Sequence, residues 1–162
     1  MTSEFVHLHN HSDYSLLDGA QRIDQLVNTI DDLNMDSVAL TEHGNMFSVI
    51  PYYKSAKKAG VKPIIGCETY VAMGSRFDKK PRSDGGWGNN HLVLLAQNYK
   101  GYQNLMKLVT HGYLEGFYYR PRIDMELLKK HSEGIICLSG CLKGEIPEKM
   151  LRDDTTGAQQ DA

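Results

Sequence analysis

Three histidines alternate near the amino terminus of the chain, at His7, His9 and His11. Residues 4–9 are predicted to be extended, and side chains two residues apart in an extended chain point to the same side. Neutral imidazole is the commonest transition-metal ligand in proteins. The spacing therefore predicts a metal site at the end of this run, with an ordinary polar strand end as the alternative.

Further side chains that could bind a metal follow later predicted strands. They are Glu42 and His43, Glu68, His91, and Cys141, whereas Cys67 is expected to face the opposite side of its strand from Glu68 and to pack in the core. Each one taken alone fits a structural role, since a single histidine is commonly a hydrogen-bonded side chain and a single cysteine packs as a small hydrophobe. Their recurrence at successive strand ends instead predicts one shared cation site.

The mixture of donor types indicates the metal and the reaction. Imidazole, carboxylate and thiolate together suit zinc, manganese or iron better than magnesium or calcium, and zinc is the first choice. A carboxylate such as Glu68 can bridge two cations, and paired cations activate water and neutralise phosphoryl oxygens. The predicted chemistry is phosphoester hydrolysis by metal-activated water, with Glu68, His9 and His11 as the catalytic residues.

The elements that must position these residues alternate between strands and helices. The strands are predicted at residues 4–9, 37–41, 63–72, 91–96 and 134–139. The helices are predicted at residues 23–33, 51–59, 101–111, 124–131 and 143–152. This alternation favours parallel strands joined by helical crossovers, an α/β design whose active sites lie at the carboxyl ends of the strands.

Composition and charge exclude several classes of protein. With 162 residues, 41% of them hydrophobic, the chain is expected to form one domain with a core. A formal net charge of −2 provides no basic field for unspecific duplex binding, so any nucleic-acid contact must be local. Because no apolar run or signal segment is evident and the three cysteines lack a disulfide spacing, we expect a cytoplasmic protein without membrane contact.

Several motifs resemble those of the PHP (polymerase and histidinol phosphatase) domain family. They are His-x-His-Ser at residues 9–12, Thr-Glu-His-Gly at 41–44, the strand of Glu68, His-Leu-Val-Leu-Leu-Ala at 91–96 and Leu-Ser-Gly-Cys at 138–141. The resemblance spans nearly the whole chain. Within the family, residues 13–19 and 116–124 resemble the replicative DNA polymerase alpha subunits specifically.

The resemblance implies an α/β fold, the distorted seven-stranded barrel of the PHP type. The family's last motif, a nearby Asp and His, has no counterpart before Ala162, and the strands predicted here are too few for the complete barrel. We therefore expect residues 1–150 to form a metal-binding domain that is incomplete at its carboxyl end. Residues 151–162 are expected to be a polar tail that starts the next helix.

The resemblance also implies a centre of up to three metal ions. One ion is expected on His9, His11 and Glu68, and Glu68 bridges it to a second ion. His7 and Glu42 are expected to orient the ligands rather than to bind metal. The remaining ligands implied by the resemblance are His91 and Cys141 on the second ion, and Asp18 and His43 on the third.

Two segments carry basic and aromatic side chains that could contact nucleic acid. The candidates are Arg76, Lys79, Lys80, Arg82, Tyr118, Tyr119 and Arg120. The alternative for the first segment, residues 74–90, is a solvated loop. For the second segment, the alternative is packing at the barrel mouth.

The resemblance predicts part of a bacterial replicative DNA polymerase, whose full chain synthesises DNA while this segment supplies a phosphoesterase. In the family such domains are associated with 3′–5′ exonuclease proofreading. The implied partners are DNA and other replicase subunits, including a proofreading subunit. The alternatives are a stand-alone phosphatase of a small phosphomonoester, a non-catalytic scaffold that docks a proofreading subunit, and an error-prone paralogue of the alpha subunit.

Overall fold

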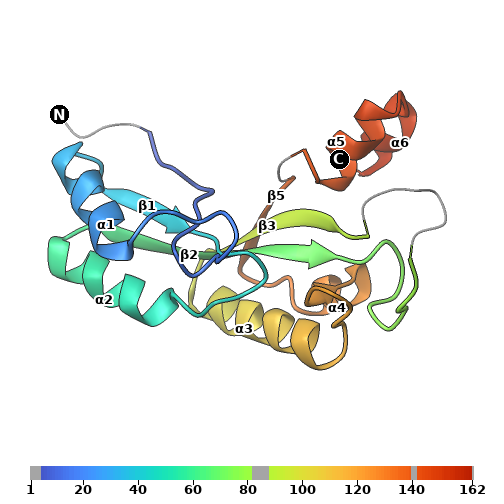
Figure 1. Cartoon of the computed structure of the whole chain (residues 1–162), viewed down its shortest axis with the longest axis horizontal. Helices are drawn as coiled ribbons and strands as arrows, with labels where there is room; N and C mark the ends of the chain where they lie inside the picture. Colours follow the sequence, from blue (N-terminus) through green and yellow to red (C-terminus); the bar gives the residue numbers. More distant parts are fainter. Residues whose placement is uncertain (1–4, 82–87, 140–141, 162) are drawn as a thin grey trace.

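The computed structural model describes residues 5–81, 88–139 and 142–161, and it has five strands and six helices within these ranges (Figure 1). The strands are β1 (Ser37–Leu40), β2 (Lys62–Val71), β3 (Asn90–Ala96), β4 (Arg122–Ile123) and β5 (Ile135–Leu138). The helices are α1 (Ile23–Asp32), α2 (Val49–Ala59), α3 (Tyr99–Leu114), α4 (Met125–Lys130), α5 (Glu145–Leu151) and α6 (Thr155–Asp161). None of these helices combines the length and apolar character needed to cross a membrane.

The strands form one open sheet in the order β1-β2-β3-β5, with β4 beside the end of β2. This arrangement confirms the α/β class and fits an incomplete barrel. The prediction of parallel neighbours holds for β1 and β4 against β2, but it is wrong for β3, which runs antiparallel to both β2 and β5. Between β2 and β3 the described residues contain no helix, and strands joined without a crossover helix can return antiparallel.

The apolar faces of the helices pack against the strands of the sheet in two main clusters. The predicted stripe of α1 packs with β1 and α2 in one cluster around Val27, Val38 and Tyr52. A second cluster joins β2 and β3 to α3 and α4, with Leu94 and Leu105 fully buried. In Figure 1, α2, α3 and α4 follow one side of the sheet, whereas α5 and α6 project beyond β5.

The amino-terminal segment is not the strand predicted at residues 4–9. Residues 5–9 have no strand assignment, although the segment runs beside β1, because Ala39 donates to the carbonyl of His7 at 2.9 Å and Thr41 donates to that of Asn10 at 2.9 Å. Two isolated backbone hydrogen bonds are too few for a ladder. They still hold the histidine segment against the carboxyl end of β1.

Asp124 begins α4 and ties the 74–81 segment to it. Its carboxylate accepts from the Leu127 amide at 2.9 Å, from the Arg76 amide at 2.9 Å and from the Arg76 guanidinium at 3.0 Å. Burial alone would raise the pKa of Asp124, but these hydrogen bonds from Arg76 and Leu127 hold it below its ordinary value. A depressed folded pKa means that the carboxylate stabilises the fold at neutral pH and loses this effect as pH falls through the folded pKa.

Asp124→Asn is therefore expected to lower the free energy of unfolding at pH 7 by about 2 kcal/mol, the size of a charged helix cap. The difference between the native chain and the variant should shrink as pH falls below about 4. Urea unfolding at pH 7 and pH 3 measures both values. A difference that stays constant between these pH values would contradict the role of the ionised carboxylate.

Candidate metal centre and adjoining cavities

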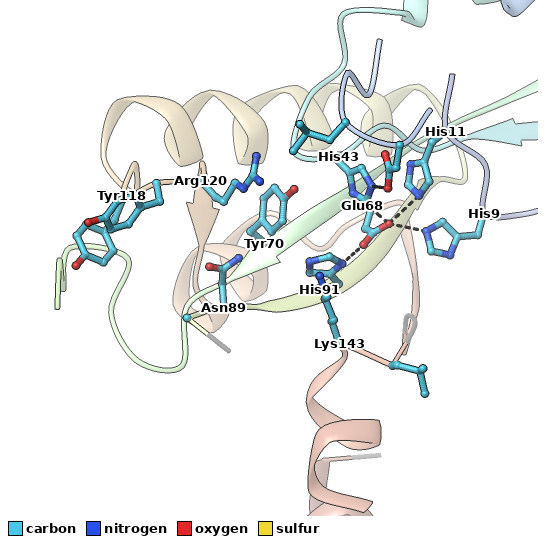
Figure 2. Close-up of a pocket in the computed structure, with 15 residues that line it drawn as sticks. His9, His11, His43, Glu68, Tyr70, Asn89, His91, Tyr118, Arg120 and Lys143 are labelled. Atoms are coloured by element: carbon cyan, nitrogen blue, oxygen red, sulfur yellow. Dashed lines mark hydrogen bonds and ion pairs between the residues drawn. The ribbon is translucent and has the colours of Figure 1, made fainter. Parts of the chain in front are cut away.

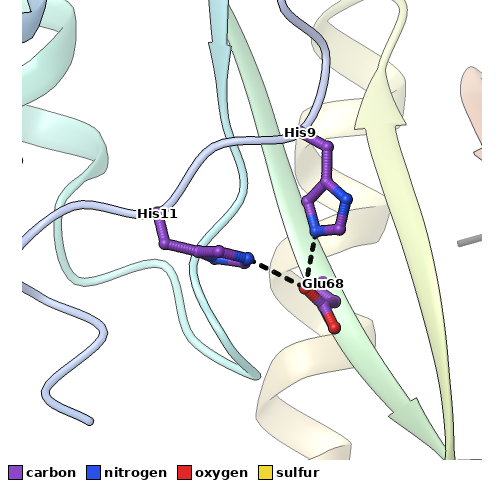
Figure 3. A group of neighbouring side chains, drawn as sticks. All are labelled: His9, His11 and Glu68. Carbon is purple, nitrogen blue, oxygen red and sulfur yellow. Dashed lines mark hydrogen bonds and ion pairs between the residues drawn. The ribbon is translucent and has the colours of Figure 1, made fainter. Parts of the chain in front are cut away.

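The centre of the candidate site is Glu68 on β2, whose side chain is only 1% exposed. Its Oε2 atom lies 2.6 Å from Nε2 of His9 and 3.0 Å from Nε2 of His11 (Figure 3). Both histidines come from the segment beside β1, and both rings point at the same carboxylate oxygen. The alternation of the sequence thus places these two imidazoles on one side.

Two further imidazoles approach Glu68 from other elements (Figure 2). His91, near the start of β3, contacts Oε1 through its Nδ1 atom. His43, which follows β1, has Nδ1 at 3.5 Å from Oε2 and Nε2 at 2.7 Å from Oδ2 of Asp18. His43 thus lies between Glu68 and Asp18. One buried carboxylate is surrounded by side chains from three separate parts of the chain.

The reversed direction of β3 is what brings His91 to this place. His91 pairs with Tyr70 on β2, two residues beyond Glu68, and Glu68 pairs with Val93. The beginning of β3 therefore lies at the carboxyl end of β2. A helical crossover would have placed the carboxyl end of β3 there instead.

Glu42 supports the loop that carries His11 and Asp18. It is buried and accepts from the Ser12 amide at 3.1 Å and from the hydroxyls of Ser12 and Ser15. The Ser15 hydroxyl in turn accepts from the His43 amide at 3.1 Å. Glu42 thus acts on the cluster through the loop.

The structure does not bring every predicted residue to the cluster. His7 is exposed and its ring meets that of Phe5 edge-on, with 4.8 Å between centroids, so it does not join the ligand groups. Cys141, predicted as a ligand, lies outside the described residues. The predicted ligands that do lie together are His9, His11, Asp18, His43, Glu68 and His91.

The electrostatics of the cluster keep its carboxylates ionised. Burial alone would raise the pKa of Glu68, but hydrogen bonds from His11, His9 and His91 hold it well below its ordinary range. Burial would lower the pKa of His11, yet the Glu68 carboxylate raises it. The pKa of Asp18 is lowered by its bond to His43, against the effect of burial. The centre of the cluster therefore carries the negative charges of Glu68 and Asp18, with imidazole rings around them.

These side chains fit metal ions. The ligand atoms form two groups that share Glu68, namely His9, His11 and Glu68, and His43, Glu68 and His91; in each group all ligand atoms lie within 4.8 Å of one another. The rings of His11 and His43 stack with centroids 4.0 Å apart. Their Nδ1 atoms are also buried without a hydrogen-bond partner among the described residues. Neutral imidazoles beside a shared carboxylate are suitable ligands for transition metals.

The PHP domain family matches residues 7–162. The chain belongs to this family. Two proteins named DNA polymerase III subunit alpha are similar to it: that of Borreliella burgdorferi is 56% identical over 149 residues, and that of Treponema pallidum is 49% identical over 158 residues. These matches cover 92% and 98% of this chain but only 13% of each relative. Among solved structures, an amidohydrolase from Chromobacterium violaceum overlaps 65% of the chain and 32% of its own, with a TM-score of 0.45 and 20% identity.

A cavity of about 780 Å³ opens over the two groups of candidate metal ligands in this PHP domain. Tyr118, Tyr119 and Arg120, predicted either to contact nucleic acid or to pack at the barrel mouth, line this cavity. Tyr119 has a positive φ of 58°. The Arg120 guanidinium lies 5.7 Å from the centroid of the Tyr70 ring (Figure 2).

Arg76, predicted to contact nucleic acid, is held in ion pairs within the chain. Its guanidinium lies 2.6 Å from Oε2 of Glu115 and 3.0 Å from Oδ2 of Asp124, and the side chain is only 11% exposed. Arg76 therefore fastens its loop to α3 and α4. Lys79 and Lys80 are exposed but do not line the cavity, and Arg82 lies outside the described residues.

Sequence reasoning missed Tyr70, Asn89 and Lys143, which also line the cavity. Tyr70 could have been found, because it lies two residues after Glu68 on a strand and so faces the same side. Asn89 and Lys143 carry no such signal. The Lys143 carbonyl accepts from the His91 amide at 2.9 Å, and this contact between distant residues places it at the cavity.

Gly44 lets the backbone after His43 pass close to the cavity wall. It has φ of +62°, and a Cβ atom there would lie 2.9 Å from both Cγ of Pro121 and Cε2 of Tyr70. Gly44→Ala is expected to lower the free energy of unfolding by about 2 kcal/mol, since it adds left-handed strain and a clash. Urea unfolding tests this value.

Gly60→Ala is the matched control, because Gly60 has φ of +78° but an added Cβ would meet nothing within 4 Å. It isolates the backbone strain, expected to cost about 1 kcal/mol. If both variants lost the same stability, the contact of Gly44 with Tyr70 and Pro121 would have no energetic role.

Proposed function

We propose that this PHP domain is a metal-dependent phosphoesterase that acts within a bacterial replicative DNA polymerase. The single observation that carries the proposal is the convergence of four imidazoles on buried Glu68 at the floor of an open cavity. A purely structural site would close its coordination shell with protein ligands, whereas a catalytic site keeps access for water and substrate. The cavity provides that access.

The two ligand groups around Glu68 would hold the metal ions, with Asp18 beside His43 available to a further ion. We propose zinc first, with manganese or iron as alternatives, because the ligands mix imidazole nitrogen and carboxylate oxygen. Bound there, the ions would supply an activated water and offset the charge of a phosphoryl group. Cys141 stays a proposed ligand.

The chain's own residues would position the substrate. Arg120 and Lys143 both line the cavity and present cationic groups that attract a phosphate. Tyr70 lines the same cavity, and its hydroxyl would donate a hydrogen bond to a phosphoryl oxygen. Buried Glu68 holds His9 and His11 in fixed directions, so the ligands need little rearrangement.

We further propose that the substrate is the 3′ end of a DNA strand and that the reaction is exonuclease proofreading. The names of the similar alpha subunits support a replication context. DNA synthesis by a longer chain, contact with other replicase subunits including a proofreading subunit, and a cytoplasmic location belong to this proposal as well. The chain spans 13% of the length of those relatives.

The test measures metal content and hydrolysis together on the purified protein. Elemental mass spectrometry should find at least two zinc or manganese ions per chain, and a single strand labelled at its 3′ end should be shortened. Removal of the metal by a chelator should abolish shortening, and added zinc or manganese should restore it. Hydrolysis of 4-nitrophenyl phosphate alone would favour a phosphomonoesterase. A folded protein that holds no metal and hydrolyses neither substrate would favour the non-catalytic scaffold that docks a proofreading subunit.

A further inference from the structure

A second cavity, of about 670 Å³, adjoins the one over the metal-ligand groups. The residues that line both cavities are Leu17, His43, Tyr70 and Arg120. These shared side chains place the two cavities next to each other, and the pair is termed the groove. Arg120 is the cationic side chain at their junction. A substrate that extended beyond its reacting phosphate would enter this second cavity.

The walls of the second cavity are aromatic and apolar. Phe47, just before α2, is 65% exposed, and its ring centroid lies 6.3 Å from that of Tyr113 on α3. Leu16, 91% exposed, and Tyr14 line it from the loop before α1. Large apolar side chains that stay exposed together beside a polar centre mark a binding surface.

We propose that this second cavity, the Phe47 cavity, binds an unpaired nucleoside of the strand whose phosphodiester reaches the metal groups. The proposal rests on the proposed function and narrows its substrate class. Flat nucleobases stack on aromatic rings irrespective of base identity, which suits Phe47 and Tyr113. Arg120 would bind the phosphate that links this nucleoside to the reacting one. Asp13, also at this cavity, disfavours a phosphate deeper inside.

Other occupants fit the groove less well. A small phosphomonoester would fill only the first cavity and leave the aromatic wall without a contact. A duplex would keep its bases stacked on one another, and a chain of net charge −2 provides no general attraction for two phosphate backbones. The groove therefore favours a single strand of at least two nucleosides.

The test compares Phe47→Ala with Tyr99→Ala. Tyr99 is a similarly exposed aromatic residue that lines a different cavity, so it controls for the loss of an exposed ring. Fluorescence anisotropy would measure binding of a labelled oligothymidylate, and competition would measure binding of thymidine monophosphate. Phe47→Ala is expected to weaken oligothymidylate binding about tenfold, the effect of losing one stacked base, and to leave the monophosphate within twofold. Tyr99→Ala should change neither.

Unchanged oligothymidylate binding in Phe47→Ala would overturn the proposal, as would a native protein that binds no oligothymidylate. Equal weakening of both ligands would also overturn it, because the effect would then lie in the first cavity. The test also separates this proposal from the proposed function. If Phe47→Ala selectively lost strand binding but the native protein hydrolysed nothing, the nucleoside site at the Phe47 cavity would stand and only the phosphoesterase proposal would fail. Where hydrolysis occurs, Phe47→Ala should raise KM for a thymidine dinucleotide about tenfold.

Discussion

Glu68→Gln is expected to lose metal from both ligand groups at once, because Glu68 is the residue that the two groups share. The glutamine keeps the size of the side chain but removes the anion that faces four imidazoles. Loss of a residue that merely supports a ligand costs about 10–100-fold in metal affinity, so loss of the shared ligand should exceed 100-fold. Hydrolysis should fall by on the order of 10³-fold or more.

Elemental mass spectrometry on the native protein, Glu68→Gln and His9→Gln measures the effect. His9 belongs to only one of the two groups, so His9→Gln should retain the ion held by His43, Glu68 and His91. His7→Gln is the matched control, since His7 is a nearby exposed histidine outside both groups, and it should keep full metal content. Full metal content in Glu68→Gln would refute the shared-ligand assignment.

Arg122→Met is expected to lower the free energy of unfolding by about 3 kcal/mol. Arg122 is only 3% exposed, and its guanidinium donates to the carbonyls of Gly116 at 3.0 Å, Arg76 at 3.1 Å and Asp78 at 2.8 Å. Methionine has a similar apolar stem but no donor. Each buried carbonyl left without a partner costs about 1–3 kcal/mol, and partial access of water to the Asp78 carbonyl would offset some of this loss.

Urea unfolding of three variants separates this role from simple charge loss. Arg122→Lys keeps the charge but has one ammonium in place of the guanidinium fork, so it should recover only part of the stability. Arg22→Met removes an exposed arginine, whose Nε atom lies 3.5 Å from Asp24, and should change stability by less than about 0.5 kcal/mol. Equal stability of Arg122→Met and the native chain would show that the three carbonyls do not depend on Arg122.

Local patterns in the sequence were sufficient for part of the site. The two-residue spacing of His9 and His11 predicted that their rings would share one side, and both rings face Glu68. The apolar stripes predicted α1 and α2, and Gly60 ends α2 in the left-handed conformation, with φ of +78°. The helix features depend on contacts within a few residues, so local spacing determines them. The directions of His9 and His11 depend in addition on the hydrogen bonds that hold their segment beside β1.

The tertiary structure alone decided how distant segments meet. No local pattern specifies that β3 reverses and brings His91 to Glu68, because strand direction depends on which partner is available in space. Arg76 and Arg122 resemble any exposed basic residues in the sequence, yet burial against specific carboxylates and carbonyls makes them structural. The Phe47 cavity likewise exists only because the loop before α1, the start of α2 and the end of α3 lie side by side. The sequence determined which chemical groups were available, and long-range packing determined their distances from one another.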